Sequence, residues 1–217
     1  MVETILPLAL VIGLSPLPII PAILLLMTPR ARGNATAFLC AWLAALTGLV
    51  VAMIALGAVV DPAQPDEGGI TWIKVVTGGA FLAMALVKWL RRPRPGQPPK
   101  TPRWVAELEH YTPRRSARLG ALLAAGNPKN LLMSLAAGAE IALLAGSAAA
   151  TAAAAAGFIA VSSIGVATPI LARAVLGERA APALRSGRAW LDRNATVLSV
   201  GVLTALGVAL VLRGTVA

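Results

Sequence analysis

The sequence predicts an all-α polytopic membrane protein in which six transmembrane helices form two inverted three-helix repeats. Of its 217 residues, 58% are hydrophobic and only 13% are charged, and the mean hydropathy is +0.79. A soluble domain of this size cannot bury so much apolar surface, whereas apolar runs long enough to cross a bilayer recur along the chain. This fold class is predicted from these runs, from the cations between them, and from two cap-and-proline pairs within them.

Six apolar segments are long enough to span a bilayer. They are expected at residues 3–28, 34–60, 70–90, 116–143, 148–174 and 189–212. Residues 119–172 contain only two charges, Lys129 and Glu140, and form a run far too long for one span. We therefore expect the chain to turn within this run, at Gly146 and Ser147.

The cations alternate between the loops that join these segments. Loops one, three and five carry two, eight and five Lys or Arg residues, whereas loops two and four carry none. The positive-inside rule then places the odd loops in the cytoplasm and both termini outside. The same distribution argues against nucleic acid as a partner despite the net charge of +10, because the cations lie where anionic headgroups are expected.

Two cap-and-proline pairs interrupt the first and fourth segments. Ser15-Pro16 and Asn127-Pro128 each lie about a dozen residues into an apolar run, roughly 17 Å from its start at helical rise. Ser and Asn are favourable N-caps and Pro suits the first helical position, so each pair predicts a second half-helix that begins at membrane depth. Interrupted helices at matching positions of two halves indicate a transporter with a site near the bilayer midplane.

The chain is expected to form a single membrane domain over residues 1–217. Its first repeat covers residues 1–90 and its second covers 119–217, and a basic cytoplasmic linker at 91–118 joins them. The linker begins with a Pro-rich stretch that excludes a helix. Next come Trp104, Leu108 and Tyr111 at helical spacing, which indicate an amphipathic helix on the membrane surface, with a disordered linker as the alternative.

The candidate substrate-binding site combines the two interruptions. Its residues are Ser15, Pro16, Pro18, Asn127, Pro128, Lys129 and Asn130. An ionisable residue at membrane depth indicates function, and a half-helix N-terminus beside an ammonium suits a phosphate, sulfate or carboxylate group. The structural alternative is that Lys129 donates to carbonyl groups freed by the break in the first span and meets no ligand.

Other chemistries find little support in the sequence. Glu140 is a candidate for proton coupling, with a solvated helix-end charge as the alternative. His110 is the only His and Cys40 the only Cys, and the spans contain neither an acidic cluster for a divalent metal nor a phosphate-binding glycine-rich loop. We therefore expect no catalytic residues, no metal and no cofactor, and we do not expect an enzyme.

An ordered set of short motifs along nearly the whole chain resembles the GAP family of peptidoglycolipid- or sulfolipid-addressing proteins, which is grouped with lysine-exporter-like transporters. The most specific motif is Asn127-Pro128-Lys129-Asn130. The others are Ser15-Pro16, Thr28-Pro29-Arg30-Ala31-Arg32 with Asn34, Lys88-Trp89-Leu90-Arg91-Arg92-Pro93, Pro102-Arg103-Trp104, and Trp190-Leu191 with Asn194.

The resemblance implies a homodimeric six-helix protein of the inner (plasma) membrane that helps to move a glycolipid toward the cell surface. Its partners would then be a membrane lipid or glycolipid substrate and the machinery of lipid synthesis or export. Two alternatives remain: a non-transporting accessory scaffold that uses residues 91–118 for docking, and an exporter of small amino-acid-like solutes. The acidic motifs of cation-exporting relatives are absent, which argues against ion export.

Overall fold

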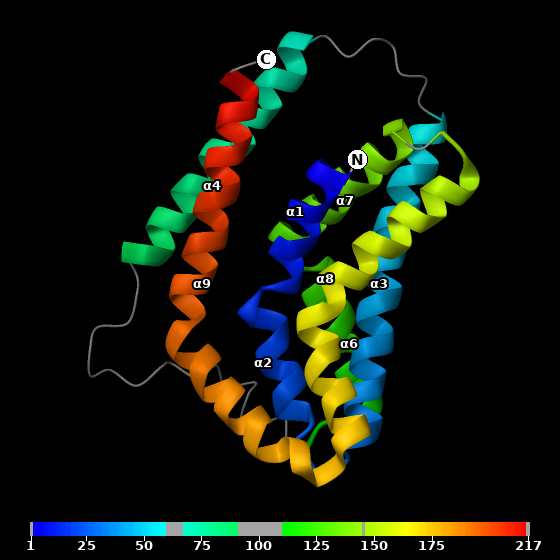
Figure 1. Ribbon diagram of the computed structural model, residues 1–217, viewed down its shortest axis with the longest axis vertical. Coiled ribbons are helices and arrows are strands. Elements are labelled where there is room, and N and C mark those ends of the chain that lie inside the picture. Colours follow the sequence, from blue (N-terminus) through cyan, green and yellow to red (C-terminus); the bar gives the residue numbers. More distant parts are fainter. Residues whose placement is uncertain (1, 60–66, 91–109, 145, 216–217) are drawn as a thin grey trace. The chain divides into compact units, whose positions relative to one another are not determined.

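The computed structural model describes residues 2–59, 67–90, 110–144 and 146–215 (Figure 1). Within these ranges the chain is helical and contains no β-strand, which confirms the predicted all-α class. The helices are α1 (Val2–Gly13), α2 (Pro16–Leu25), α3 (Ala31–Val59), α4 (Glu67–Leu90), α6 (Pro113–Ala125), α7 (Pro128–Leu144), α8 (Ala148–Leu176) and α9 (Ala181–Thr215), with a 3₁₀ turn, η2 (Gly177–Ala180), before α9.

Each predicted segment corresponds to one helix or to a pair of consecutive helices. Both predicted breaks are confirmed, because α1 ends before α2 begins at Pro16, and α6 ends before α7 begins at Pro128. The predicted turn at Gly146 and Ser147 is also confirmed, and the Ser147 side chain caps α8 by accepting a hydrogen bond from the backbone N–H of Ala150 (3.2 Å).

The last helix differs from its prediction, since α9 begins at Ala181 rather than near residue 189. Its first two turns contain Arg185 and Arg188, which lower the hydropathy of this stretch but are good helix formers. The predicted surface helix around Trp104 and Leu108 lies outside the described residues. Tyr111 belongs to the connection that precedes α6.

By length and apolar composition, two helical stretches of the described chain can cross a membrane, Ala31–Leu56 and Ala148–Ala209. A third crossing is added if the bent pair Thr4–Gly13 and Pro16–Leu25 counts as one span. These stretches indicate a membrane protein. The six-span count of the sequence prediction exceeds what these criteria select in the described residues.

The chain divides into two compact units. The larger unit contains α1, α2, α3, α6, α7, α8, η2 and the start of α9 up to Asp192. The smaller unit contains α4 and the part of α9 from Arg193 onward, where Phe81 and Leu203 are among the buried side chains.

Helix α3 is central to the larger unit and contacts α6, α7 and α8. Every fourth residue along one face of α3 is buried, which is the spacing of a helix face turned toward a core. The stripe consists of Asn34, Phe38, Trp42, Leu46 and Val50. The indole N–H of Trp42 donates to the hydroxyl of Ser163 on α8 (3.2 Å), so the stripe also links α3 to α8 through a buried hydrogen bond.

Small residues allow α6 to approach α3 closely. Ser116, Gly120 and Ala124 are buried at four-residue intervals along α6, and small residues at this spacing are typical of helix contacts in membranes. A Cβ atom on Gly120 would collide with the backbone carbonyl of Phe38. The two helices therefore meet backbone to backbone, and this contact positions the start of α7.

Candidate functional site

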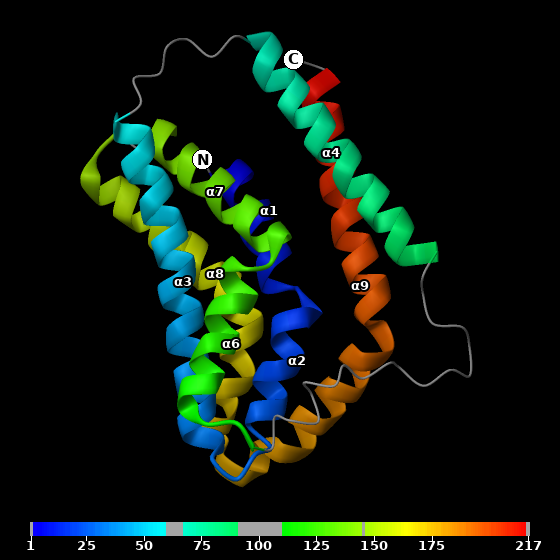
Figure 2. The same cartoon turned by 180° about the vertical axis from the view of Figure 1, so that it is seen from behind.

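The break between α1 and α2 bends the first apolar segment by 46° (Figure 2). Pro16 has no backbone N–H to donate. The backbone N–H of Ser15 donates to the Ile12 carbonyl (3.1 Å) and not to the Val11 carbonyl, which would be its partner in a continuous α-helix. The Val11 carbonyl therefore loses its acceptor role within the helix. Ser15 occupies the N-cap position of α2, but its side chain makes no capping hydrogen bond, which corrects the predicted capping role of that side chain.

The break between α6 and α7 is capped as the sequence predicts. The Asn127 side-chain oxygen accepts from the backbone N–H of Lys129 (3.1 Å), and the Asn127 carbonyl accepts the first bond of the new helix, from Leu131 (2.9 Å). Pro128 fills the first helical position, where the missing N–H costs nothing. Asn127 and Pro128 together therefore start α7 immediately after α6 ends.

Asn130 closes the other side of the same break. Its side-chain amide N–H donates to the carbonyl of Leu123 in the last turn of α6 (3.0 Å). Asn130 is fully buried, and its side-chain oxygen has no hydrogen-bond partner among the described residues. The residue thus satisfies a carbonyl that the end of α6 would otherwise leave unpaired.

Lys129 joins the two breaks. Its ammonium nitrogen donates to the Val11 carbonyl oxygen at 2.7 Å, although the two residues are 118 positions apart in the chain. This is the carbonyl that the α1–α2 break releases from the helix, so the structure has the contact that the structural alternative for Lys129 anticipated. We call the paired breaks, linked by Val11 and Lys129, the polar junction.

The remaining predicted site residues fall into two groups. Ser15, Pro16 and Pro18 are buried on the α2 side of the first break, within two turns of Val11. Glu140 is half-buried on α7, 11 residues beyond Lys129, a separation of about 16 Å along a helix. The structure therefore brings the two breaks together and leaves the Glu140 carboxylate outside the polar junction.

Helix α8 packs closely against the first break. A Cβ atom on Gly13 would lie 2.6 Å from the Val161 carbonyl oxygen, and one on Gly165 would collide with the Gly13 carbonyl. Neither glycine can be enlarged without moving a backbone. The bend in the first segment therefore packs directly against α8.

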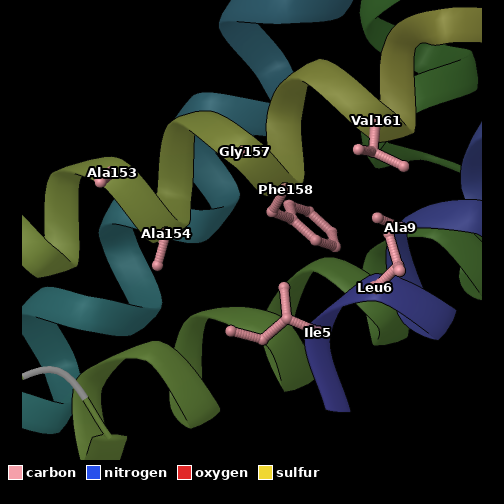
Figure 3. A pocket seen from close by; sticks show the side chains of 8 residues that line it. All are labelled: Ile5, Leu6, Ala9, Ala153, Ala154, Gly157, Phe158 and Val161. Atoms are coloured by element: carbon pink, nitrogen blue, oxygen red, sulfur yellow. The ribbon is translucent and has the colours of Figure 1, made fainter. Parts of the chain in front are cut away.

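An apolar cavity of about 220 Å³ lies between α1 and α8 (Figure 3). Its walls are Ile5, Leu6, Ala9, Ala153, Ala154, Gly157, Phe158 and Val161. The α8 wall is made largely of small residues, and the Phe158 ring points toward α1 (Figure 3). Leu6, Ala153 and Gly157 are exposed, so the cavity borders the outer surface of these helices.

The sequence prediction did not include any of the residues that line this cavity. The available signal was the Ala-rich stretch at 148–156, which supplies small side chains opposite the larger ones of α1. Small residues are typical of close helix packing in membranes, but here an apolar cavity lies beside part of this stretch. Among the described residues, no group of three or more His, Cys, Asp or Glu side chains could hold a metal ion.

Comparisons with known proteins agree with the membrane architecture. A family model described as "Sap, sulfolipid-1-addressing protein" matches residues 5–215. No curated protein and no solved structure matches the chain. The match covers both breaks, the polar junction and the residues around the apolar cavity.

Proposed function

Because the chain belongs to the sulfolipid-1-addressing protein family, we propose that it is an inner-membrane transporter or flippase. It assists the export of an amphipathic lipid or glycolipid to the cell envelope. Family membership supports a membrane protein concerned with addressing a lipid. The transport mechanism is our inference from the site.

The observation that carries this proposal is the position of the apolar cavity beside the polar junction. Val161 lines the cavity, and its carbonyl lies against Gly13 at the first break. Val11, whose carbonyl accepts from Lys129, is two residues before Gly13. An amphipathic molecule needs an apolar site for its hydrocarbon chain and a polar site for its headgroup, separated by no more than its own length. A hydrocarbon chain would lie between α1 and α8, and the headgroup would meet the polar groups of the two breaks.

The dimensions and chemistry of the cavity suit a hydrocarbon chain. At about 220 Å³ it is larger than the apolar cavity of about 150 Å³ that takes up benzene. Its eight lining residues carry apolar side chains or, at Gly157, none. An amino-acid-like solute would lose its hydration there without gaining partners for its charges, so the lining favours a lipid over a small polar solute.

The element order supports an inverted repeat for this transporter. A broken helix, α1–α2, precedes α3 and α4 in the first half, and a second broken helix, α6–α7, precedes α8 and α9 in the second half. With odd loops in the cytoplasm, the two halves run in opposite directions through the membrane, as in transporters built from inverted repeats. The proposal includes six spans, both termini outside, and a homodimer.

Cavity filling tests the proposal directly. Ala154→Phe places a ring inside the cavity, whereas Ala152→Phe places the same ring on an exposed position of the same helix that does not line the cavity. Each variant is reconstituted in liposomes with a fluorescent glycolipid, and movement between leaflets is followed by chemical quenching of the outer leaflet. We expect Ala154→Phe to slow movement at least tenfold and Ala152→Phe to slow it less than twofold.

Two outcomes would reject parts of this proposal. Equal slowing by both variants, with melting temperatures unchanged, would remove the cavity from the mechanism. A wild-type protein that moves the lipid no faster than protein-free liposomes would reject a flippase and favour the accessory scaffold. Ala154→Leu provides a smaller filling side chain if Ala154→Phe lowers the melting temperature.

A further inference from the structure

Helices α3 and α6 begin side by side at the same end of the larger unit (Figures 1 and 2). The side-chain amide of Asn34, in the first turn of α3, donates to the carbonyl of Tyr111 just before α6 (2.9 Å) and to the Thr28 hydroxyl (3.2 Å). A Cβ atom on Gly33 would lie 3.4 Å from Pro113. The two helix N-termini, separated by about 80 residues of chain, are therefore fixed next to each other.

Four arginines surround these two N-termini. Arg30 and Arg32 flank the first residue of α3, and Arg114 and Arg115 lie in the first turn of α6. All four are exposed, and none forms an ion pair with a carboxylate in the part of the chain that the structure describes. We call these four residues the arginine platform.

The backbone beneath the arginine platform is held in place by hydrogen bonds. Asn34 is fully buried, and the Thr28 hydroxyl donates to the Leu25 carbonyl (2.8 Å). Thr112 caps α6 by accepting from the backbone N–H of Arg115 (3.4 Å). The side chains of the arginine platform therefore extend from a positioned backbone, which reduces the ordering that ligand binding would require.

We propose that the arginine platform binds the phosphate or sulfate headgroup of an anionic membrane lipid. Guanidinium groups form paired hydrogen bonds with such oxygens, and two adjacent helix N-termini add to the positive potential. Because Ala31–Leu56 is a candidate membrane span, its first turn lies at the level of the headgroups, which favours a lipid over an acidic protein. This binding goes beyond the proposed function, because it holds whether or not the bound lipid is moved.

Native mass spectrometry of the full chain in detergent tests the proposal, with phosphatidylglycerol as the anionic probe and phosphatidylcholine as the neutral one. The test variant Arg30→Gln/Arg115→Gln removes one guanidinium from each side of the platform. The matched control Arg179→Gln/Arg185→Gln removes two exposed arginines that lie after α8. An arginine that contacts the bound headgroup contributes about fivefold in affinity, so we expect about 25-fold weaker phosphatidylglycerol binding in the test variant. The control arginines lie outside the arginine platform, so their removal should weaken binding less than about twofold.

Several results would overturn this assignment. If both variants lost phosphatidylglycerol binding equally, the positive surface would be diffuse. If the wild type bound phosphatidylcholine as strongly as phosphatidylglycerol, headgroup charge would not be recognised. Displacement of the lipid by inorganic phosphate, beyond the effect of chloride at equal ionic strength, would mean a site for a small free anion. If the test variant kept its lipid but lost binding of a poly-glutamate peptide, the arginine platform would be a protein-docking surface. The melting temperature of each variant separates these outcomes from misfolding.

Discussion

Replacing Lys129 with Met removes the donor that links the two broken helices. Methionine has a similar length and can lie along the same path, but it cannot donate to the Val11 carbonyl, which is 2.7 Å from the ammonium nitrogen in the native protein. That carbonyl has already lost its helical donor, because Ser15 bonds to Ile12. The substitution therefore leaves a backbone acceptor unpaired at the bend of the first segment.

The size of the effect follows from this contact. Hydrogen bonds between membrane helices average about 0.6 kcal/mol and reach about 1.7 kcal/mol, and a charged donor roughly doubles the strength. An orphaned carbonyl adds about 1–3 kcal/mol, whereas removing a half-buried cation returns part of its desolvation cost. We expect a net loss of about 2 kcal/mol, which corresponds to a melting temperature lower by about 4–8 °C for a chain of this size.

Thermal unfolding in detergent, followed by circular dichroism, measures this loss. Lys88→Met is the matched control, because Lys88 is an exposed lysine in the last turn of α4, and its melting temperature should stay within about 1 °C of the wild type. An unchanged melting temperature for Lys129→Met, together with lost lipid movement, would refute a linking role and make Lys129 a substrate ligand. A lowered melting temperature with lipid movement lost in proportion would support the linking role.

Two further pairs of substitutions test the packing of α6 against α3 and the cap of α7. Gly120→Ala should destabilise the protein by about 1–3 kcal/mol, because its Cβ atom would collide with the Phe38 carbonyl; Gly48→Ala, on an exposed face of α3 with nothing within 4 Å, should instead stabilise it by about 0.5–1 kcal/mol. A loss of similar size at both positions in thermal unfolding would contradict the close contact of α3 with α6. Asn127→Ala should cost about 1 kcal/mol by removing the cap on α7, and Asn127→Ser should restore most of it; the same melting temperature in both variants would mean that the cap contributes nothing.

The local features of this chain follow from short-range chemistry, and the sequence predicts them well. Pro16 and Pro128 each follow a residue suited to the N-cap position, Ser15 and Asn127, and this pairing placed both breaks to the residue. Proline alone does not break a helix in this chain, because Pro7 and Pro169 lie inside α1 and α8. The caps of α7 and α8 depend on side chains two or three residues from the atoms they bond. Ser15 is the exception among the predicted caps, because its side chain forms no bond to the start of α2.

Contacts between distant segments required the tertiary structure. The sequence left Lys129 with two roles, and only the crossing of α1 with α7 identifies the Val11 carbonyl as its hydrogen-bond acceptor. The arginine platform likewise depends on the Asn34–Tyr111 hydrogen bond, which joins segments 77 residues apart.

Composition and the two cap-and-proline pairs thus determined that this is a helical membrane protein with two interrupted segments, because hydropathy and helix capping depend on residues close together in the chain. The partner of Lys129 and the apolar cavity between α1 and α8 were decided by the fold. Gly13 and Gly165 let the bend rest on α8, and the small side chains of the α8 wall beyond that contact do not fill the space facing α1. Which helix faces meet is a property of packing in three dimensions, and neither periodicity nor composition specifies it.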